Sequence, residues 1–280
     1  MLPRERISAA LARAAPAATG ERARTARAAP ERRVPALVAF MTAGYPDPGE
    51  FLSVLRAVGG AADAVEIGVP FSDPMADGVT IQRSSRHAIE RGVSLKWIFA
   101  ELARRDYELP SPVLLMSYLN PLLAFGDESK DSAAGYAKLA ARAHDVGVSG
   151  FIVPDLPYEE SAPLRAALDG HGLALVQLVT PATPPERLRT LCLGSQGFVY
   201  AVTRLGITGA ESALPEETAK YLAAVKAASE LPVCAGFGVR RAEQVATIGR
   251  HADGVIVGSA LIEVLERGED PAQFLRSLRG

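Results

Sequence analysis

This chain of 280 residues has no long apolar runs, few cysteines and almost no net charge. No apolar segment approaches the ~18–20 residues that a bilayer-spanning helix requires, so we expect no membrane association. The formal net charge is only -2, which gives no basic footprint for nucleic acid. The two cysteines, Cys192 and Cys234, lie far apart in apolar surroundings and are expected to be free thiols. These features predict a cytoplasmic protein.

The first 33 residues differ in composition from the rest of the chain, because they are rich in alanine and arginine. A short helix is predicted over residues 7–14, and the remainder of 1–33 is interpreted as a flexible N-terminal extension. Glu5, Glu21 and Glu31 argue against an organelle transit peptide, since such peptides are poor in acidic residues. Residues 34–280 are interpreted as one catalytic domain.

From residue 34 onward, short β-rich apolar runs alternate with segments of helical spacing. The predicted strands are 36–41, 64–68, 113–118, 150–154, 173–180, 197–202, 233–236 and 254–257. The predicted helices are 51–58, 81–91, 95–104, 132–146, 159–168, 185–193, 215–228, 241–248, 260–264 and 271–278. Eight strand–helix units in one domain predict an α/β fold, a (β/α)8 TIM barrel with an N-terminal helical extension. A doubly wound open sheet is the alternative, but no Gly-x-Gly-x-x-Gly follows the first strand.

Glu66 is the only charged residue in the apolar run 64–71. In a strand its side chain points to the opposite face from Val65 and Ile67. Burial raises the pKa of a carboxyl group toward neutrality, which suits acid–base catalysis. The turn that follows supplies two more carboxylates, Asp73 and Asp77. A structural role is the alternative for Glu66 and for Asp77. Glu66 could pair with an arginine, and Asp77 could cap the helix near Thr80.

Glycines follow the last two predicted strands, as Gly236-Phe237-Gly238 and Gly258-Ser259. Barrels often bind phosphate between these loops and at the start of a short helix, because glycine lets backbone N–H groups approach an anion. The alternative is that the glycines only form tight turns. Residues 204–215 contain two glycines and suit a mobile lid or an ordinary surface loop.

The chain has five lysines and none lies at the end of a predicted strand, which disfavours Schiff-base chemistry. Its four histidines fall in helices or at their far ends, with no metal-ligand spacing, so no metal site is expected. No Ser–His–Asp set is visible. With these three mechanisms disfavoured, the sequence indicates an enzyme that binds a phosphorylated substrate and uses carboxylates for catalysis.

The segment 64–78, Ala-Val-Glu-Ile-Gly-Val-Pro-Phe-Ser-Asp-Pro-Met-Ala-Asp-Gly, closely resembles the signature of the tryptophan synthase alpha chain family. The resemblance continues in segments at nearly every strand end: 42–47, 154–157, 206–209, 236–238 and 258–259. It implies retro-aldol cleavage of indole-3-glycerol phosphate to indole and glyceraldehyde 3-phosphate. It also implies that indole passes to a beta chain in an αββα heterotetramer, and that pyridoxal phosphate belongs to the beta chain and not to this one.

The resemblance further assigns roles to individual residues. Asp77 would accept the indole N–H and Glu66 would move protons. The implied substrate-binding residues are Phe40, Tyr118, Tyr200, Thr208, Gly209, Gly238, Gly258 and Ser259. Asp73 and Arg204 would support the loops that close over the site.

Two alternative functions follow from the same pattern. One is a sugar-phosphate isomerase or lyase on the same barrel. The isomerases of this kind that act on histidine or tryptophan precursors usually place acids or a cysteine at strands one and five, where this chain has Thr42 and Thr180. The other is a non-catalytic phosphate-binding regulatory subunit, against which the presence of both Glu66 and Asp77 argues.

Overall fold

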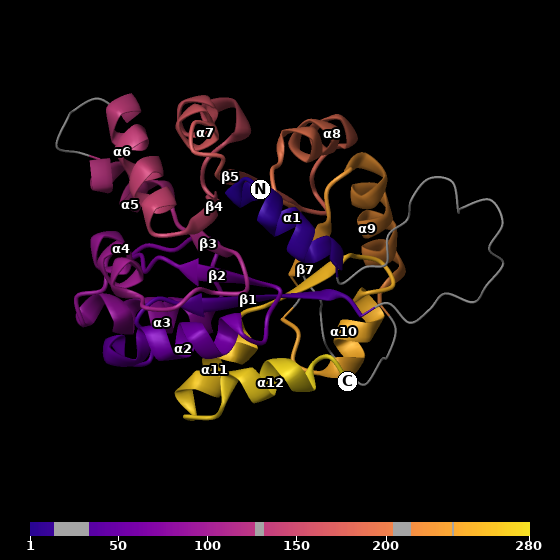
Figure 1. Cartoon of the computed structure of the whole chain (residues 1–280). Coiled ribbons are helices and arrows are strands. Elements are labelled where there is room, and N and C mark those ends of the chain that lie inside the picture. Colours follow the sequence, from indigo (N-terminus) through magenta and orange to yellow (C-terminus); the bar gives the residue numbers. More distant parts are fainter. Residues whose placement is uncertain (14–33, 127–131, 204–213, 237) are drawn as a thin grey trace.

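The eight apolar runs form a closed barrel of parallel strands in the computed structural model of the chain (Figure 1). The structure describes residues 1–13, 34–126, 132–203, 214–236 and 238–280. The strands are β1 (Ala36–Thr42), β2 (Ala64–Gly68), β3 (Val113–Met116), β4 (Val148–Ile152), β5 (Ala174–Val179), β6 (Val199–Val202), β7 (Val233–Gly236) and β8 (Gly254–Val257). They lie in sequence order, and β8 closes the sheet by pairing with β1. The predicted (β/α)8 barrel is confirmed, and the open doubly wound sheet is excluded.

Helices surround the barrel and connect its strands (Figure 1). Their bounds in the described residues are α1 (Pro3–Arg13), α2 (Phe51–Gly59), α3 (Val79–Glu90), α4 (Leu95–Arg104), α5 (Leu119–Gly126), α6 (Ser132–Asp145), α7 (Ala162–Asp169), α8 (Pro185–Gly194), α9 (Glu216–Ala228), α10 (Ala242–Ile248), α11 (Ser259–Glu266) and α12 (Pro271–Ser277). Short 3-10 turns lie at Pro48–Glu50 and Tyr158–Glu160.

Helix α5 is missing from the sequence prediction, which instead extends the third strand to Tyr118. The strand ends at Met116, and α5 begins at Leu119. The Leu119 backbone N–H donates to Asp155 Oδ1 at 2.9 Å, which satisfies one of the free donors of the first helical turn. Pro121 is tolerated there because the first turn needs no N–H from it. The partner of this helix start comes from the loop after β4, which the local pattern does not reveal.

Successive side chains of each strand point to opposite faces of the sheet and so contribute to two different apolar cores. On β2, Val65 and Ile67 face the surrounding helices and join the large outer core. Ala64 faces the barrel interior, where it packs with Leu114, Ile152 and other inward side chains. Glu66 lies between Val65 and Ile67 in sequence and therefore also points inward.

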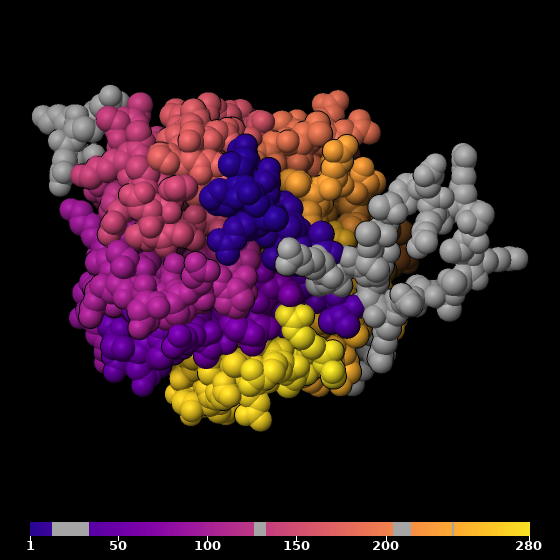
Figure 2. Space-filling model, viewed as in Figure 1, coloured from indigo at the N-terminus to yellow at the C-terminus, as the bar shows by residue number. Residues whose placement is uncertain are grey.

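Helix α1 closes the end of the barrel at which the strands begin. Its Ile7 and Leu11 are fully buried and belong to the interior core. Ser8 Oγ donates to the Gly197 carbonyl at 2.8 Å, just before β6. Figure 2 shows α1, in indigo, lying across the middle of this face. The helix thus starts earlier than the predicted 7–14 and packs firmly on the barrel, while residues 14–33 lie outside the described part of the chain.

Candidate active site

Glu66 lies inside the barrel near the end of β2. It is paired in register with Phe40 of β1 and Leu114 of β3. Its side chain is fully buried, and neither carboxylate oxygen has a hydrogen-bond partner among the described residues. The described structure therefore offers no arginine pair of the kind that a purely structural glutamate would need.

Burial raises the pKa of the Glu66 carboxyl from 4.5 to about 8. The cause is desolvation, because the charged form loses its water and gains no partner in the described structure. At neutral pH this carboxyl is largely protonated and can donate a proton. A group whose pKa lies this close to neutrality can also take a proton back.

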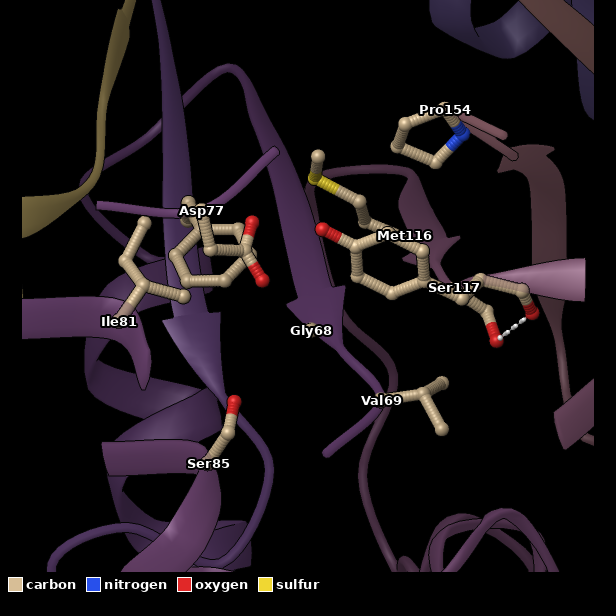
Figure 3. A pocket seen from close by; sticks show the side chains of 10 residues that line it. Gly68, Val69, Asp77, Ile81, Ser85, Met116, Ser117 and Pro154 are labelled. Carbon is tan, nitrogen blue, oxygen red and sulfur yellow. Dashed lines mark hydrogen bonds between the residues drawn. The ribbon is translucent and has the colours of Figure 1, made fainter. Parts of the chain in front are cut away.

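Asp77 faces a pocket from the loop between β2 and α3. Figure 3 shows its carboxylate directed into the space between Ile81 and Met116. Burial raises the pKa of Asp77, and the Tyr118 hydroxyl partly opposes this by lowering it. The helix cap of α3 is Gly78, with no side-chain cap bond, so the capping role considered for Asp77 is wrong.

The pocket beside Asp77 is narrow, with about 10 Å³ accessible to the centre of a water molecule, and it is partly open to solvent. Its lining mixes apolar and polar side chains and comprises Phe40, Gly68, Val69, Asp77, Ile81, Ser85, Met116, Ser117, Tyr118 and Pro154. The Phe40 ring lies directly over Gly68: a Cβ at residue 68 would come within 2.5 Å of the ring. Glycine at the end of β2 is therefore what allows the Phe40 ring to form this wall.

Tyr118 connects the pocket wall to the Asp77 loop. Its hydroxyl accepts a hydrogen bond from the Ala76 backbone N–H at 2.8 Å. Its ring stacks on Phe71, with centroids 5.1 Å apart. Tyr118 is thus a buried side chain that supports the loop, in addition to forming part of the pocket.

Tyr200, on β6, lies within electrostatic reach of both carboxyl groups. Burial raises its pKa well above the usual value, and Glu66 and then Asp77 raise it further. Its hydroxyl lies close to Gly236 at the end of β7, where an added Cβ would be 3.0 Å from the oxygen. The structure therefore brings Glu66, Asp77 and Tyr200 together from three places in the sequence.

The ends of β7 and β8 lie side by side, since Gly236 pairs with Ile256. Gly238 has a positive φ of 64°, and a Cβ there would meet nothing within 4 Å. Gly258 is the N-cap of α11 and has no side chain to accept from the N–H groups of the first turn, which begins at Ser259. Such a helix start presents N–H donors and a partial positive charge to an anion.

Three of the predicted site residues, Arg204, Thr208 and Gly209, lie outside the described residues. Asp73 is exposed in the loop after β2 and accepts a hydrogen bond from Ser72 Oγ at 2.5 Å. Asp73 lies in the same loop as Asp77 but does not line the pocket.

The sequence prediction gave no site role to seven of the ten pocket residues, among them Ile81, Ser85 and Met116. Ile81 and Ser85 are four positions apart on α3 and therefore share a face. Met116 follows Leu114 by two positions and so faces the same side of β3. These spacings could have suggested their positions, but only once the neighbouring strand and loop were known.

The described ranges contain no group of three or more His, Cys, Asp or Glu side chains able to hold a metal ion. None of the helices in this part of the chain has the length and apolarity to cross a membrane.

A closed (β/α)8 barrel with partly or fully buried carboxyl groups at its strand ends is typical of a barrel enzyme whose active site lies at that end. A family model described as "Tryptophan synthase alpha chain" matches residues 26–279, and the chain belongs to this family. The tryptophan synthase alpha chain of Solidesulfovibrio magneticus is 44% identical over 246 residues, which are 88% of this chain and 93% of that relative. The alpha chain of Chromobacterium violaceum is 44% identical over 234 residues, or 82% and 86% of the two chains.

Solved structures agree with this assignment. Tryptophan synthase subunit alpha from Legionella pneumophila has a TM-score of 0.79 at 32% identity, covering 100% of this chain and 97% of that one. A chain of the aminoacrylate- and BRD0059-bound tryptophan synthase from M. tuberculosis has a TM-score of 0.76 at 33% identity, covering 88% and 91%. The chain is accordingly a carbon–carbon lyase that cleaves indole-3-glycerol phosphate, and it acts with a beta chain in tryptophan biosynthesis.

Proposed function

We propose that Glu66 and Asp77 carry out the cleavage of indole-3-glycerol phosphate in this chain. The observation that supports this most strongly is the buried, unpaired Glu66 carboxyl inside the barrel. A carboxyl group kept in this state costs stability, and such a cost is typical of a functional group rather than a structural one.

The reaction needs one proton delivered and one removed. Protonated Glu66 gives its proton to C3 of the indole ring, which turns the ring into an iminium-like electrophile. Glu66, now a carboxylate, takes the proton of the side-chain hydroxyl as the bond from C3 to the side chain breaks. The electron pair of that bond returns to the ring, and indole and glyceraldehyde 3-phosphate leave. Glu66 ends the cycle protonated.

Asp77 accepts the indole N–H and stabilises the positive charge that develops at N1. A fixed charge partner in a water-poor site can lower a barrier by roughly 3–4 kcal/mol, by analogy with single oxyanion donors. The partial burial that raises the pKa of Asp77 also strengthens this interaction, because the surrounding dielectric is low.

The two ends of the substrate bind in different parts of the site. Phe40, Tyr118 and Tyr200 hold the indole ring. The backbone at Gly209, Gly238, Gly258 and Ser259 holds the phosphate, as helix starts and glycine-rich loops do elsewhere. To Thr208 and Arg204, which lie outside the described residues, we assign the family's role of supporting closure over the site, together with Asp73.

We also propose the wider setting of the reaction. The chain is cytoplasmic and forms an αββα heterotetramer with its beta chain. Indole passes to that partner, which holds pyridoxal phosphate, whereas this chain needs no cofactor of its own. Residues 34–280 form the barrel of the catalytic domain, and α1 from the preceding segment 1–33 packs into its interior core.

Release of indole from indole-3-glycerol phosphate by the purified chain, with and without beta chain, tests the proposal. Glu66→Gln and Asp77→Asn should each lower kcat by at least ~100-fold, the scale of one lost acid–base or charge-stabilising group. Both variants should keep the circular dichroism spectrum of the wild type. Near-normal turnover by either variant would refute the role of that residue.

A further inference from the structure

Glu266, the last residue of α11, joins three separate elements through its carboxylate. Arg83 on α3 donates to it twice, from Nε to Oε1 at 2.9 Å and from Nη2 to Oε2 at 2.7 Å. The Tyr45 hydroxyl, which follows β1, donates to Oε1 at 2.5 Å. Most exposed ion pairs contribute little, but a bidentate arginine pair with a third hydrogen bond has a fixed geometry.

The Tyr45 contact is the buried part of this cluster. Tyr45 is only 6% exposed, and burial together with Glu266 raises its pKa to about 12. Its ring packs with Phe40 and Ile262 in a small apolar cluster. Phe40 also lines the pocket beside Asp77. The contact with Glu266 is therefore continuous with the pocket wall.

Helix α3 extends the contact from Arg83 to Asp77. Gln82, adjacent to Arg83, donates from Nε2 to the Asp77 backbone carbonyl at 2.9 Å. The Gln82 backbone N–H donates to the Gly78 carbonyl at 3.0 Å. The position of the Asp77 carboxylate therefore follows the position of α3.

Helix α11 extends the contact in the other direction, to the glycine-rich strand ends. The helix has 8 residues, so its length is about 12 Å at 1.5 Å per residue. Strand β8 fixes its start, buried Ile262 holds its middle, and Glu266 fixes its far end. Because α11 is short and held at both ends, the N–H groups of its first turn, which starts at Ser259, keep a constant direction relative to α3.

We propose that Glu266 is a positioning residue for the cleavage reaction. With Arg83 and Tyr45, it sets the distance between Asp77, which binds the indole end of the substrate, and the start of α11, which binds the phosphate end. This inference rests on the proposed roles of Asp77 and Ser259. A substrate that spans both ends needs the correct separation, whereas a molecule that touches one end does not.

Steady-state kinetics of Glu266→Gln test the role, because the substitution keeps the size of the side chain and removes its charge. We expect kcat/KM for indole-3-glycerol phosphate to fall about 10-fold or more, since a displacement of ~1 Å can cost ~100-fold in rate. Inhibition constants for glycerol 3-phosphate, which reaches only the phosphate end, and for indole, which reaches only the other end, should stay at the wild-type values. A general loss of structure would weaken both inhibitors.

Glu269→Gln is the matched control. Glu269 accepts a similar bidentate pair from Arg267, at 2.6 and 3.0 Å, but this pair lies within one segment and does not reach α3. Its kinetics should equal those of the wild type. Tyr45→Phe, which removes one of the three hydrogen bonds to Glu266, should give a smaller loss of kcat/KM and serves as the test if Glu266→Gln does not fold.

Two results would overturn the positioning role: an unchanged kcat/KM in Glu266→Gln, or equal weakening of the two one-ended inhibitors in that variant. Failure of the proposed function has a different signature. If the wild-type chain releases no indole with its beta chain, the proposed function fails; if the wild type is active and Glu266→Gln equals it, only the positioning role fails.

Discussion

Replacing Glu66 by glutamine should make the stability of the protein less sensitive to pH. Burial keeps the folded-state carboxyl protonated up to a pKa of about 8, against 4.5 for the ordinary value. The unfolded chain ionises above its ordinary pKa and is then favoured over the folded state. The wild type therefore loses stability as the pH rises from about 4.5 to about 8, with the full loss above that value.

The magnitude follows from the size of this pKa change. It corresponds to on the order of 5 kcal/mol of unfolding free energy, as an upper bound, since each pKa unit is worth about 1.4 kcal/mol. Glutamine has nearly the same shape and does not ionise. The difference in stability between Glu66→Gln and the wild type should thus shift in favour of the variant by several kcal/mol between pH 5 and pH 9.

Urea unfolding of both proteins, followed by circular dichroism at pH 5, 7 and 9, measures this difference. Other titrating groups are common to the two proteins and cancel in the comparison. Parallel stability curves, with a constant difference at all three pH values, would refute the account of Glu66 as a buried and unpaired acid. Such a result would mean that the carboxyl is solvated or paired.

Two further substitutions test the architecture of the site. Gly68→Ala should raise KM for indole-3-glycerol phosphate, because the new Cβ would lie 2.5 Å from the Phe40 ring and would displace this pocket-lining side chain; an unchanged KM would contradict the role of glycine here. Leu11→Ala should lower the unfolding free energy by about 2–5 kcal/mol, as expected for a fully buried leucine, while kcat is unchanged because α1 closes the opposite end of the barrel. Loss of kcat without loss of stability in this variant would show that α1 acts on the site.

The alternation of side chains on a strand was enough to predict where Glu66 points. Val65 and Ile67 are apolar and must face the helices, so Glu66 must face the interior. The same reasoning predicts the barrel itself, since continuous apolar strands separated by amphipathic helices fit a parallel sheet covered on its outer face. These features depend on local pattern, which the sequence carries directly.

Features that depend on distant contacts could not be predicted in this way. Helix α5 depends on a bond from Leu119 to Asp155, which belongs to the next strand's loop. The packing of α1 depends on backbone carbonyls before β5 and β6. The contact of Glu266 with Arg83 joins residues 183 positions apart. No spacing rule connects such residues until the barrel has placed them together.

A direct titration of the Glu66 carboxyl tests the central claim. Infrared difference spectroscopy on protein labelled with 13C-glutamate, with Glu66→Gln as the reference, isolates the signal of this one group. We expect the protonated carboxyl band to disappear with a midpoint near pH 8, in line with the pKa of about 8 that burial produces. A midpoint near the ordinary value of 4.5 would contradict the account.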